Sequence, residues 1–187
     1  FTGAKNLTLI TPSQWLADLT RRSFLQEYPV EVHYNTIDTN IFKPTPSDFR
    51  ERYGLQDKII VLGVANVWDE RKGLNDFYKL AQMLDERYAI VLVGLSKKQM
   101  KALPRNIRGI QRTNSPQELA EIYTAADVFF NPTYEDNYPT VNLEAQACGI
   151  RVITYDTGGC RETLFTENST IIAAGNVDEL CRRIITV

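Results

Sequence analysis

A charged loop follows the apolar stretch 58–65; it contains Asn66, Arg71 and Lys72 and ends at Gly73, where a helical pattern begins. A cation at the amino end of a helix opposes the helix dipole, at a cost of roughly 0.3–1 kcal/mol each. An anion held between the two cations and the free backbone N–H groups would reverse that sign. The loop therefore indicates an anion site, with a solvated charged turn as the alternative.

A second polar loop leads into the helix expected over residues 139–148. Pro139 suits the first helical position, since the N–H that proline lacks is not needed there, and Asn137 or Tyr138 would then be the cap. Glu144 is a carboxylate on an otherwise small and apolar helix, and a buried carboxylate needs a partner. Sugar hydroxyls would serve, because an ionised carboxylate only accepts hydrogen bonds. A structural salt bridge to lysine or arginine is the alternative.

Short β-branched runs alternate with amphipathic stretches along the chain, and these elements must position both loops. The alternation predicts an α/β fold with a Rossmann-like parallel sheet and helices on both faces. In such sheets ligands bind beyond the carboxyl ends of the strands, which is where both loops lie. The expected strands span residues 7–10, 30–34, 58–65, 88–94, 107–110, 127–131, 151–155 and 170–173. The expected helices begin near residues 13, 47, 73, 115, 139 and 176, with a short helix after 158–159 and a basic turn over 97–104.

A linker divides the chain into two parts. Pro44 and Pro46 follow a polar, turn-prone segment, and two prolines so close together are typical of a linker. We place the boundary near residue 44, with one unit at 1–44 and a second at 45–187. Because the chain begins with Phe1 and shows no signal peptide, we interpret it as a piece of a longer protein.

The composition excludes several classes of protein. The 187 residues carry 21 Lys and Arg against 23 Asp and Glu, and this near-neutral balance argues against binding of nucleic acid. No apolar run approaches the roughly 18 residues that a membrane span needs. The three cysteines lack the spacing of a disulfide framework or a zinc site, which favours a reduced, intracellular compartment. The one histidine, His33, is expected to be packed within an alternating apolar stretch.

Several motifs occur in a characteristic order along the chain. Lys72-Gly73 follows a strand, and it is followed by the run NPTYEDNYP at 131–139 and the run EAQACGIRVI at 144–153. Asp156-Thr157-Gly158-Gly159 with Arg161-Glu162 comes next, while 34–38 and 42–44 precede them all. Together these motifs resemble those of the family 4 glycosyltransferases, which are retaining enzymes with the two Rossmann-like lobes of the GT-B architecture. The resemblance implies that residues 45–187 are the donor-binding lobe of a GT-B fold.

The resemblance implies a role for each residue of the site. Lys72 would bind the donor diphosphate, and Glu144 would bind the ribose hydroxyls of the nucleotide. The acid that holds the donor sugar would be Asp136, which has the family's spacing to Glu144, with Glu135 as the second choice. The backbone at the start of the helix would face the sugar and the phosphates, which adds Asn137, Tyr138, Pro139 and Thr140 to the donor-binding set.

The charges around the phosphates depart from the family pattern at one position. The family commonly has an arginine where this chain has Asn66, and Arg71 is the candidate that replaces its charge. The resemblance implies a reaction without metal or cofactor, so the leaving diphosphate would be stabilised electrostatically by Lys72 and the helix start.

For the whole protein the resemblance implies transfer of a sugar from a nucleotide-diphosphate donor to a glycan or other acceptor. The acceptor would be bound mainly by an N-terminal lobe that precedes this chain, and the chain stops before the family's closing helix. The fragment alone is therefore expected to bind the donor weakly and to lack transferase activity. The full-length enzyme would act in polysaccharide biosynthesis in the cytoplasm, with peripheral association with the inner face of the membrane as an option. A nucleotide-sugar epimerase of the same architecture and a non-catalytic nucleotide-binding module are the alternatives.

Overall fold

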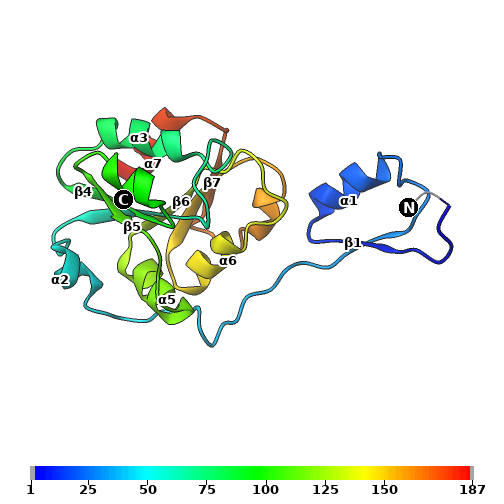
Figure 1. Cartoon of the computed structure of the whole chain (residues 1–187), viewed down its shortest axis with the longest axis horizontal. Coiled ribbons are helices and arrows are strands. Elements are labelled where there is room, and N and C mark those ends of the chain that lie inside the picture. Colours follow the sequence, from blue (N-terminus) through cyan, green and yellow to red (C-terminus); the bar gives the residue numbers. More distant parts are fainter. Residues whose placement is uncertain (1–2, 186–187) are drawn as a thin grey trace.

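The computed structural model of the chain describes residues 3–185, in two parts joined by an extended segment (Figure 1). The smaller, N-terminal unit consists of β1 (Leu9–Thr11), α1 (Gln14–Arg21) and β2 (Val30–Val32), and its two strands are parallel. As expected, Ser13 caps α1, because its hydroxyl accepts a hydrogen bond from the backbone N–H of Leu16. The chain then runs without helix or strand across the predicted linker into the larger part.

The larger part is built on one sheet of six parallel strands, which confirms the predicted fold class. In spatial order the strands are β5-β4-β3-β6-β7-β8. The order reverses between β3 and β6, so the connections that leave these two strands diverge and open a crevice at the carboxyl edge. Their bounds are β3 (Ile59–Val64), β4 (Tyr88–Val93), β5 (Ile107–Ile110), β6 (Val128–Asn131), β7 (Arg151–Tyr155) and β8 (Thr170–Ile172).

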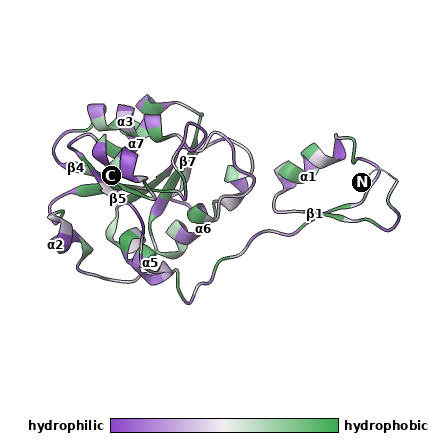
Figure 2. Ribbon diagram, viewed as in Figure 1, coloured by the Kyte–Doolittle hydropathy of each residue, from purple (hydrophilic) through white to green (hydrophobic). Residues whose placement is uncertain are grey.

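Helices cover both faces of this sheet (Figure 1). One face carries α3 (Leu74–Met83), α4 (Lys97–Lys101) and α7 (Val177–Ile185), and the other carries α2 (Phe49–Tyr53), α5 (Pro116–Ala125) and α6 (Thr140–Ala147). Apolar residues are concentrated in the strands and polar residues on the outer sides of the helices (Figure 2). The strands are apolar on both sides because each face packs against a helical layer.

Two local predictions differ from the structure at helix starts. The expected basic turn over 97–104 begins with the short helix α4 instead. Ser96 and Gln99 form a reciprocal capping box there, a signal present in the sequence as Ser-x-x-Gln. Pro139, expected at the first helical position, is the cap of α6, and the helix begins one residue later at Thr140. The extended backbone of Pro139 (φ −69°, ψ 106°) accounts for this shift, because a helical residue needs a negative ψ.

The expectation that His33 is packed is wrong. β2 ends at Val32, so the alternating pattern no longer buries the next side chain. The His33 side chain is 59% exposed, and its Nε2 atom lies 3.2 Å from a carboxylate oxygen of Glu31. The three cysteines are buried and free of disulfide bonds. Within residues 3–185, none of the helices has the length and apolar character needed to cross a membrane.

Candidate functional site

The main candidate site is a cavity of about 510 Å³ at the carboxyl edge of the sheet. It lies where the connections that leave β3 and β6 diverge, which is the position where open parallel sheets bind ligands. Its walls come from the end of β3 and the following loop, the loop after β6 and the first turns of α6, with one residue each from α5 and the linker. The lining residues are Asn35, Val64, Ala65, Asn66, Val67, Arg71, Lys72, Leu119, Asp136, Tyr138, Pro139, Thr140, Val141 and Glu144.

Most of the residues predicted from the sequence meet in this cavity. Lys72 and Glu144, which are far apart in the chain, line the same hollow, together with Asn66, Arg71, Asp136, Tyr138, Pro139 and Thr140. Two predicted residues do not line it. Glu135 borders a separate cavity of about 460 Å³ that it shares with Arg71 and Tyr134. Asn137 is exposed and is absent from the lining of both cavities.

An ion pair between Lys72 and Asp136, which both line the cavity, joins the loop after β3 to the loop after β6. The Lys72 ammonium donates a hydrogen bond to Oδ2 of Asp136, and each side chain is 20% exposed. The loops are further joined by Arg71, whose Nη1 donates to the Glu135 carbonyl at 3.0 Å and whose carbonyl accepts from the Tyr134 N–H at 2.8 Å. The site therefore holds a positioned ammonium group that an entering anion would meet.

Glu144 has a hydroxyl partner and not the salt bridge that the sequence left open. The buried Tyr123 of α5 donates its O–H to Oε2 of Glu144 at 3.0 Å. Among residues 3–185, no lysine or arginine forms an ion pair with this carboxylate. Tyr123 lies 21 residues before Glu144 on another helix, so no local pattern could have paired them. One oxygen of Glu144 is thus held by a structural partner while the side chain still lines the cavity.

Burial shifts the pKa of the Glu144 carboxyl upward. Loss of solvent raises the pKa of its carboxyl, while hydrogen bonds from the Tyr123 and Thr140 side chains act in the opposite direction. The pKa of Tyr123 is raised as well, first by its burial and then by the neighbouring carboxylate. A carboxylate with a raised pKa is costly to keep ionised in the folded state. Its retention beside a cavity is a common sign of function.

This shift predicts how stability depends on pH. Because the pKa of Glu144 is raised on folding, its contribution to stability is fully present below the unfolded pKa and is lost as the pH rises through the folded pKa. Glu144→Gln keeps the shape but cannot ionise. We therefore expect the free energy of unfolding of the variant, relative to wild type, to increase between pH 4 and pH 8 in urea titrations. An identical difference at both pH values would contradict the shift.

The linker contributes to the site in a way that the sequence did not indicate. Asn35 lines the cavity from the segment that follows β2. The neighbouring Tyr34 places its ring 5.4 Å from the ring of Tyr138, at an interplanar angle of 33°. Tyr138 itself lines the cavity and donates its backbone N–H to Oδ1 of Asp136 at 3.3 Å. The mouth of the cavity is therefore formed partly by the N-terminal part of the chain.

Within the described part of the chain, His, Cys, Asp and Glu side chains form no group of three or more that could hold a metal ion.

Comparison with known proteins points to a single family. The model of the family described as "Glycosyl transferases group 1" matches residues 57–187. An N,N'-diacetylbacillosaminyl-diphospho-undecaprenol alpha-1,3-N-acetylgalactosaminyltransferase of Campylobacter jejuni is 29% identical over 120 residues, which cover 62% of this chain and 31% of that protein. An alpha-galactosylglucosyldiacylglycerol synthase of Streptococcus pneumoniae is 28% identical over 170 residues, which cover 81% of this chain and 44% of that protein.

Solved structures share the fold. Anabaena Alr3699/HepE in complex with UDP-glucose is 20% identical and superposes with a TM-score of 0.79, covering 95% of this chain and 52% of that one. Sucrose-phosphate synthase from Thermosynechococcus elongatus is 22% identical with a TM-score of 0.82, covering 96% and 48%. The chain thus spans about a third to a half of the length of the proteins that it matches.

Proposed function

The chain belongs to the group 1 glycosyl transferases, and from this membership we propose that residues 45–187 bind the nucleotide-diphosphate sugar of a retaining, family 4 enzyme. The observation that carries the proposal is the shared cavity of Lys72 and Glu144 at the edge where the connections that leave β3 and β6 diverge. A diphosphate fits beside the Lys72 ammonium, and ribose hydroxyls suit the carboxylate of Glu144, which only accepts hydrogen bonds.

The start of α6 supports the same placement of the phosphates. α6 begins at Thr140, and the backbone N–H groups of its first turn are oriented toward the amino end of the helix, where anions are stabilised. Thr140 and Val141 of this turn line the cavity together with Lys72. In the reaction, the leaving diphosphate would be stabilised by these fixed donors and by the lysine.

We assign residues 1–44 to the end of an N-terminal, acceptor-binding lobe of the full-length enzyme. The two parallel strands of this part form a sheet of their own, whereas parallel sheets usually have both faces covered. Ile10 and Phe24 of this unit are 63% and 75% exposed, so its apolar surface is incompletely covered. Without the remainder of that lobe, we expect this chain to bind the donor and not to transfer the sugar.

The acceptor and the cellular location follow from the relatives as proposals. The names of the Campylobacter and Streptococcus proteins contain a diphospho-undecaprenol and a diacylglycerol. These names support an acceptor carried on a lipid and a role in polysaccharide or glycolipid synthesis. The full-length enzyme would then work in the cytoplasm, at the inner face of the membrane.

Calorimetric titration of the chain tests the donor site. UDP, GDP and ADP, each with and without an attached hexose, form the panel, and the monophosphate of the best base serves as the matched ligand. We expect at least one diphosphate to bind, and its monophosphate to bind about tenfold or more weakly, because charge-assisted bonds to the second phosphate are lost. Equal affinity for the monophosphate and diphosphate would contradict the proposal.

A pair of variants separates the two neighbouring acids. Asp136 lines the cavity, whereas Glu135 borders the other one. We therefore expect Asp136→Asn to reduce the gain in affinity that the hexose adds to the nucleotide by about tenfold, the value of a charged hydrogen bond. Glu135→Gln should leave that gain unchanged. The ratio of the affinities for the sugar nucleotide and the nucleotide is the measurement, and an effect of Glu135→Gln alone would reverse the assignment.

A further inference from the structure

The short helix η1 (Cys160–Thr163) and the residues before it lie directly against the loop that follows β6. Thr157 donates its hydroxyl to the Thr133 carbonyl at 2.7 Å, and the Gly159 N–H donates to the Asp136 carbonyl at 3.1 Å. The approach is too close for side chains. A Cβ atom on Gly158, whose φ is +53°, would lie 1.9 Å from the Asp136 carbonyl oxygen, and one on Gly159 would lie 2.0 Å from the Asn137 carbonyl oxygen.

Two buried amides attach the far end of η1 to α6. Asn142 donates from Nδ2 to the Thr163 hydroxyl at 2.8 Å, and Gln146 donates from Nε2 to the Thr163 carbonyl at 2.8 Å. All three side chains are buried and hydrogen bonded. A satisfied network of this kind gives packed elements a single arrangement. η1 therefore moves with α6, the helix that carries Glu144.

On its other side, η1 reaches the N-terminal unit through Glu162. The two carboxylate oxygens of Glu162 accept hydrogen bonds from the backbone N–H groups of Gln14 at 2.7 Å and Trp15 at 2.8 Å. These donors belong to the first turn of α1, where helical N–H groups have no partner within the helix. Ser13 caps the N–H of Leu16, so α1 has one local cap and one cap from the other part of the chain. Glu162 is 148 residues away from Gln14.

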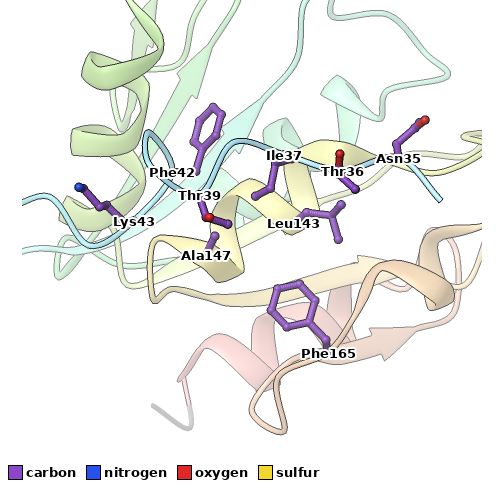
Figure 3. A pocket seen from close by; sticks show the side chains of 9 residues that line it. All are labelled: Asn35, Thr36, Ile37, Thr39, Phe42, Lys43, Leu143, Ala147 and Phe165. Atoms are coloured by element: carbon purple, nitrogen blue, oxygen red, sulfur yellow. The ribbon is translucent and has the colours of Figure 1, made fainter.

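The linker between the two parts follows the surface of α6. Figure 3 shows the segment from Asn35 to Lys43 passing over Leu143 and Ala147, with Phe165, which follows η1, on the opposite side of the same hollow. At one end of this path, Tyr34 meets Tyr138 and Asn35 lines the donor cavity. Tyr34 and Asn35 follow β2 of the N-terminal unit directly, so the place of that unit on η1 bears on where these two residues lie.

We propose that Glu162 is a positioning residue that fixes the N-terminal unit to the larger part by capping α1, and thereby holds Tyr34 and Asn35 at the mouth of the cavity. A negative carboxylate suits this position, because it faces unpaired N–H groups and the positive end of the helix dipole. The fixed orientation does not depend on any ligand. Only its consequence for donor binding rests on the proposed function.

Nuclear magnetic resonance of the ligand-free 187-residue chain tests this proposal. Residual dipolar couplings measure the orientation of the N-terminal unit relative to the larger part, and hydrogen exchange reports on the Gln14 and Trp15 amides. In Glu162→Ala we expect exchange of both amides to become about 10- to 100-fold faster, as for a lost bond to a charged group. We also expect the two parts to lose their common alignment. Glu162→Gln keeps the side-chain volume and one acceptor oxygen, so exchange of the Gln14 and Trp15 amides should lie between the rates of wild type and Glu162→Ala. This variant replaces Glu162→Ala as the test if the alanine variant folds poorly.

Two further variants serve as controls. Ser13→Ala removes the local cap of α1 but leaves Glu162 in place, so exchange at Leu16 should increase while the common alignment is kept. Glu167→Ala removes an exposed acid from the loop after η1 and should change neither quantity. Retention of the wild-type alignment in Glu162→Ala would overturn the proposal. Equal loss of alignment in Ser13→Ala would also overturn it, because the orientation would then follow only from the stability of α1. Neither measurement uses a nucleotide, so a result that overturns the role of Glu162 is distinct from a result that overturns the proposed donor site.

Discussion

Lys72→Ala is expected to weaken binding of the preferred nucleotide diphosphate by about 100-fold or more. The ammonium lines the cavity together with Thr140 and Val141 of α6, and it is already held in place by Asp136. Two effects add in the variant. The charge-assisted bonds to the diphosphate are lost, and the carboxylate of Asp136 is left without its cation, where it repels an anionic ligand. Titration calorimetry of the variant with that diphosphate measures the loss.

Lys79→Ala is the matched control. Lys79 lies on α3, which starts just after Lys72, and it also pairs with an acid, Asp76, at 2.8 Å. Its side chain is 61% exposed and it borders the other cavity, not the one that holds Lys72. Its removal should change the affinity by less than about threefold, because its charge lies outside the cavity on a solvent-exposed side chain, where its field is screened. Equal losses in the two lysine variants would show that net charge, and not the cavity, determines binding.

Gly94→Ala is expected to lower the free energy of unfolding by about 2–6 kcal/mol, since a strained backbone and an overpacked contact each cost roughly 1–3 kcal/mol. Gly94 follows β4 with a φ of +98°, a region that alanine avoids. A Cβ atom there would lie 1.6 Å from the carbonyl oxygen of Ala65, at the end of β3. Because Ala65 lines the cavity, any relaxation would also displace the site. Urea denaturation measures the loss.

Gly54→Ala separates the cost of a strained backbone from the cost of an overpacked contact. Gly54 ends α2 with a φ of +64°, but a Cβ atom there would meet no atom within 4 Å. The Gly54→Ala variant should therefore lose free energy of unfolding only through backbone strain, by about 1–2 kcal/mol for a residue in the left-handed region. A Gly94→Ala variant as mild as Gly54→Ala would show that β3 and β4 separate easily at the carboxyl edge. The site would then be built on a more flexible scaffold than its close contacts indicate.

The ion pair between Lys72 and Asp136 gives the site a defined geometry. Both groups are mostly buried, and each is the partner of the other. A donor diphosphate would share or replace Asp136 as the partner of the lysine, which frees the carboxylate to accept from a sugar hydroxyl. The pair therefore links phosphate binding to sugar recognition within the proposed donor site.

The sequence by itself determined the elements and the edge at which the site lies. A strand that is covered on both faces is a continuous apolar run, so the bounds of β3 and β4 were predicted within a residue. The bounds of β5 and β7 were predicted without error. The sequence also predicted the two helix starts that are capped by the hydroxyls of Ser13 and Ser115. Each cap accepts from an N–H only three residues away, so the signal is local. The polar loops after β3 and β6 were thereby placed at the same edge, since the parallel strands of one sheet end together. That the two loops meet follows from the adjacency of β3 and β6 in the folded sheet.

Only the tertiary structure decided which side chain faces the cavity and what holds it there. The family's spacing favoured Asp136 over Glu135, but adjacent loop residues can point either way, and the structure is what shows that Asp136 lines the cavity while Glu135 borders the other one. The partner of Glu144 depends on how α5 packs beside α6, and the cap of α1 by Glu162 joins residues 148 positions apart. Such contacts form between surfaces of folded elements, and a local pattern of residue types carries no information about them.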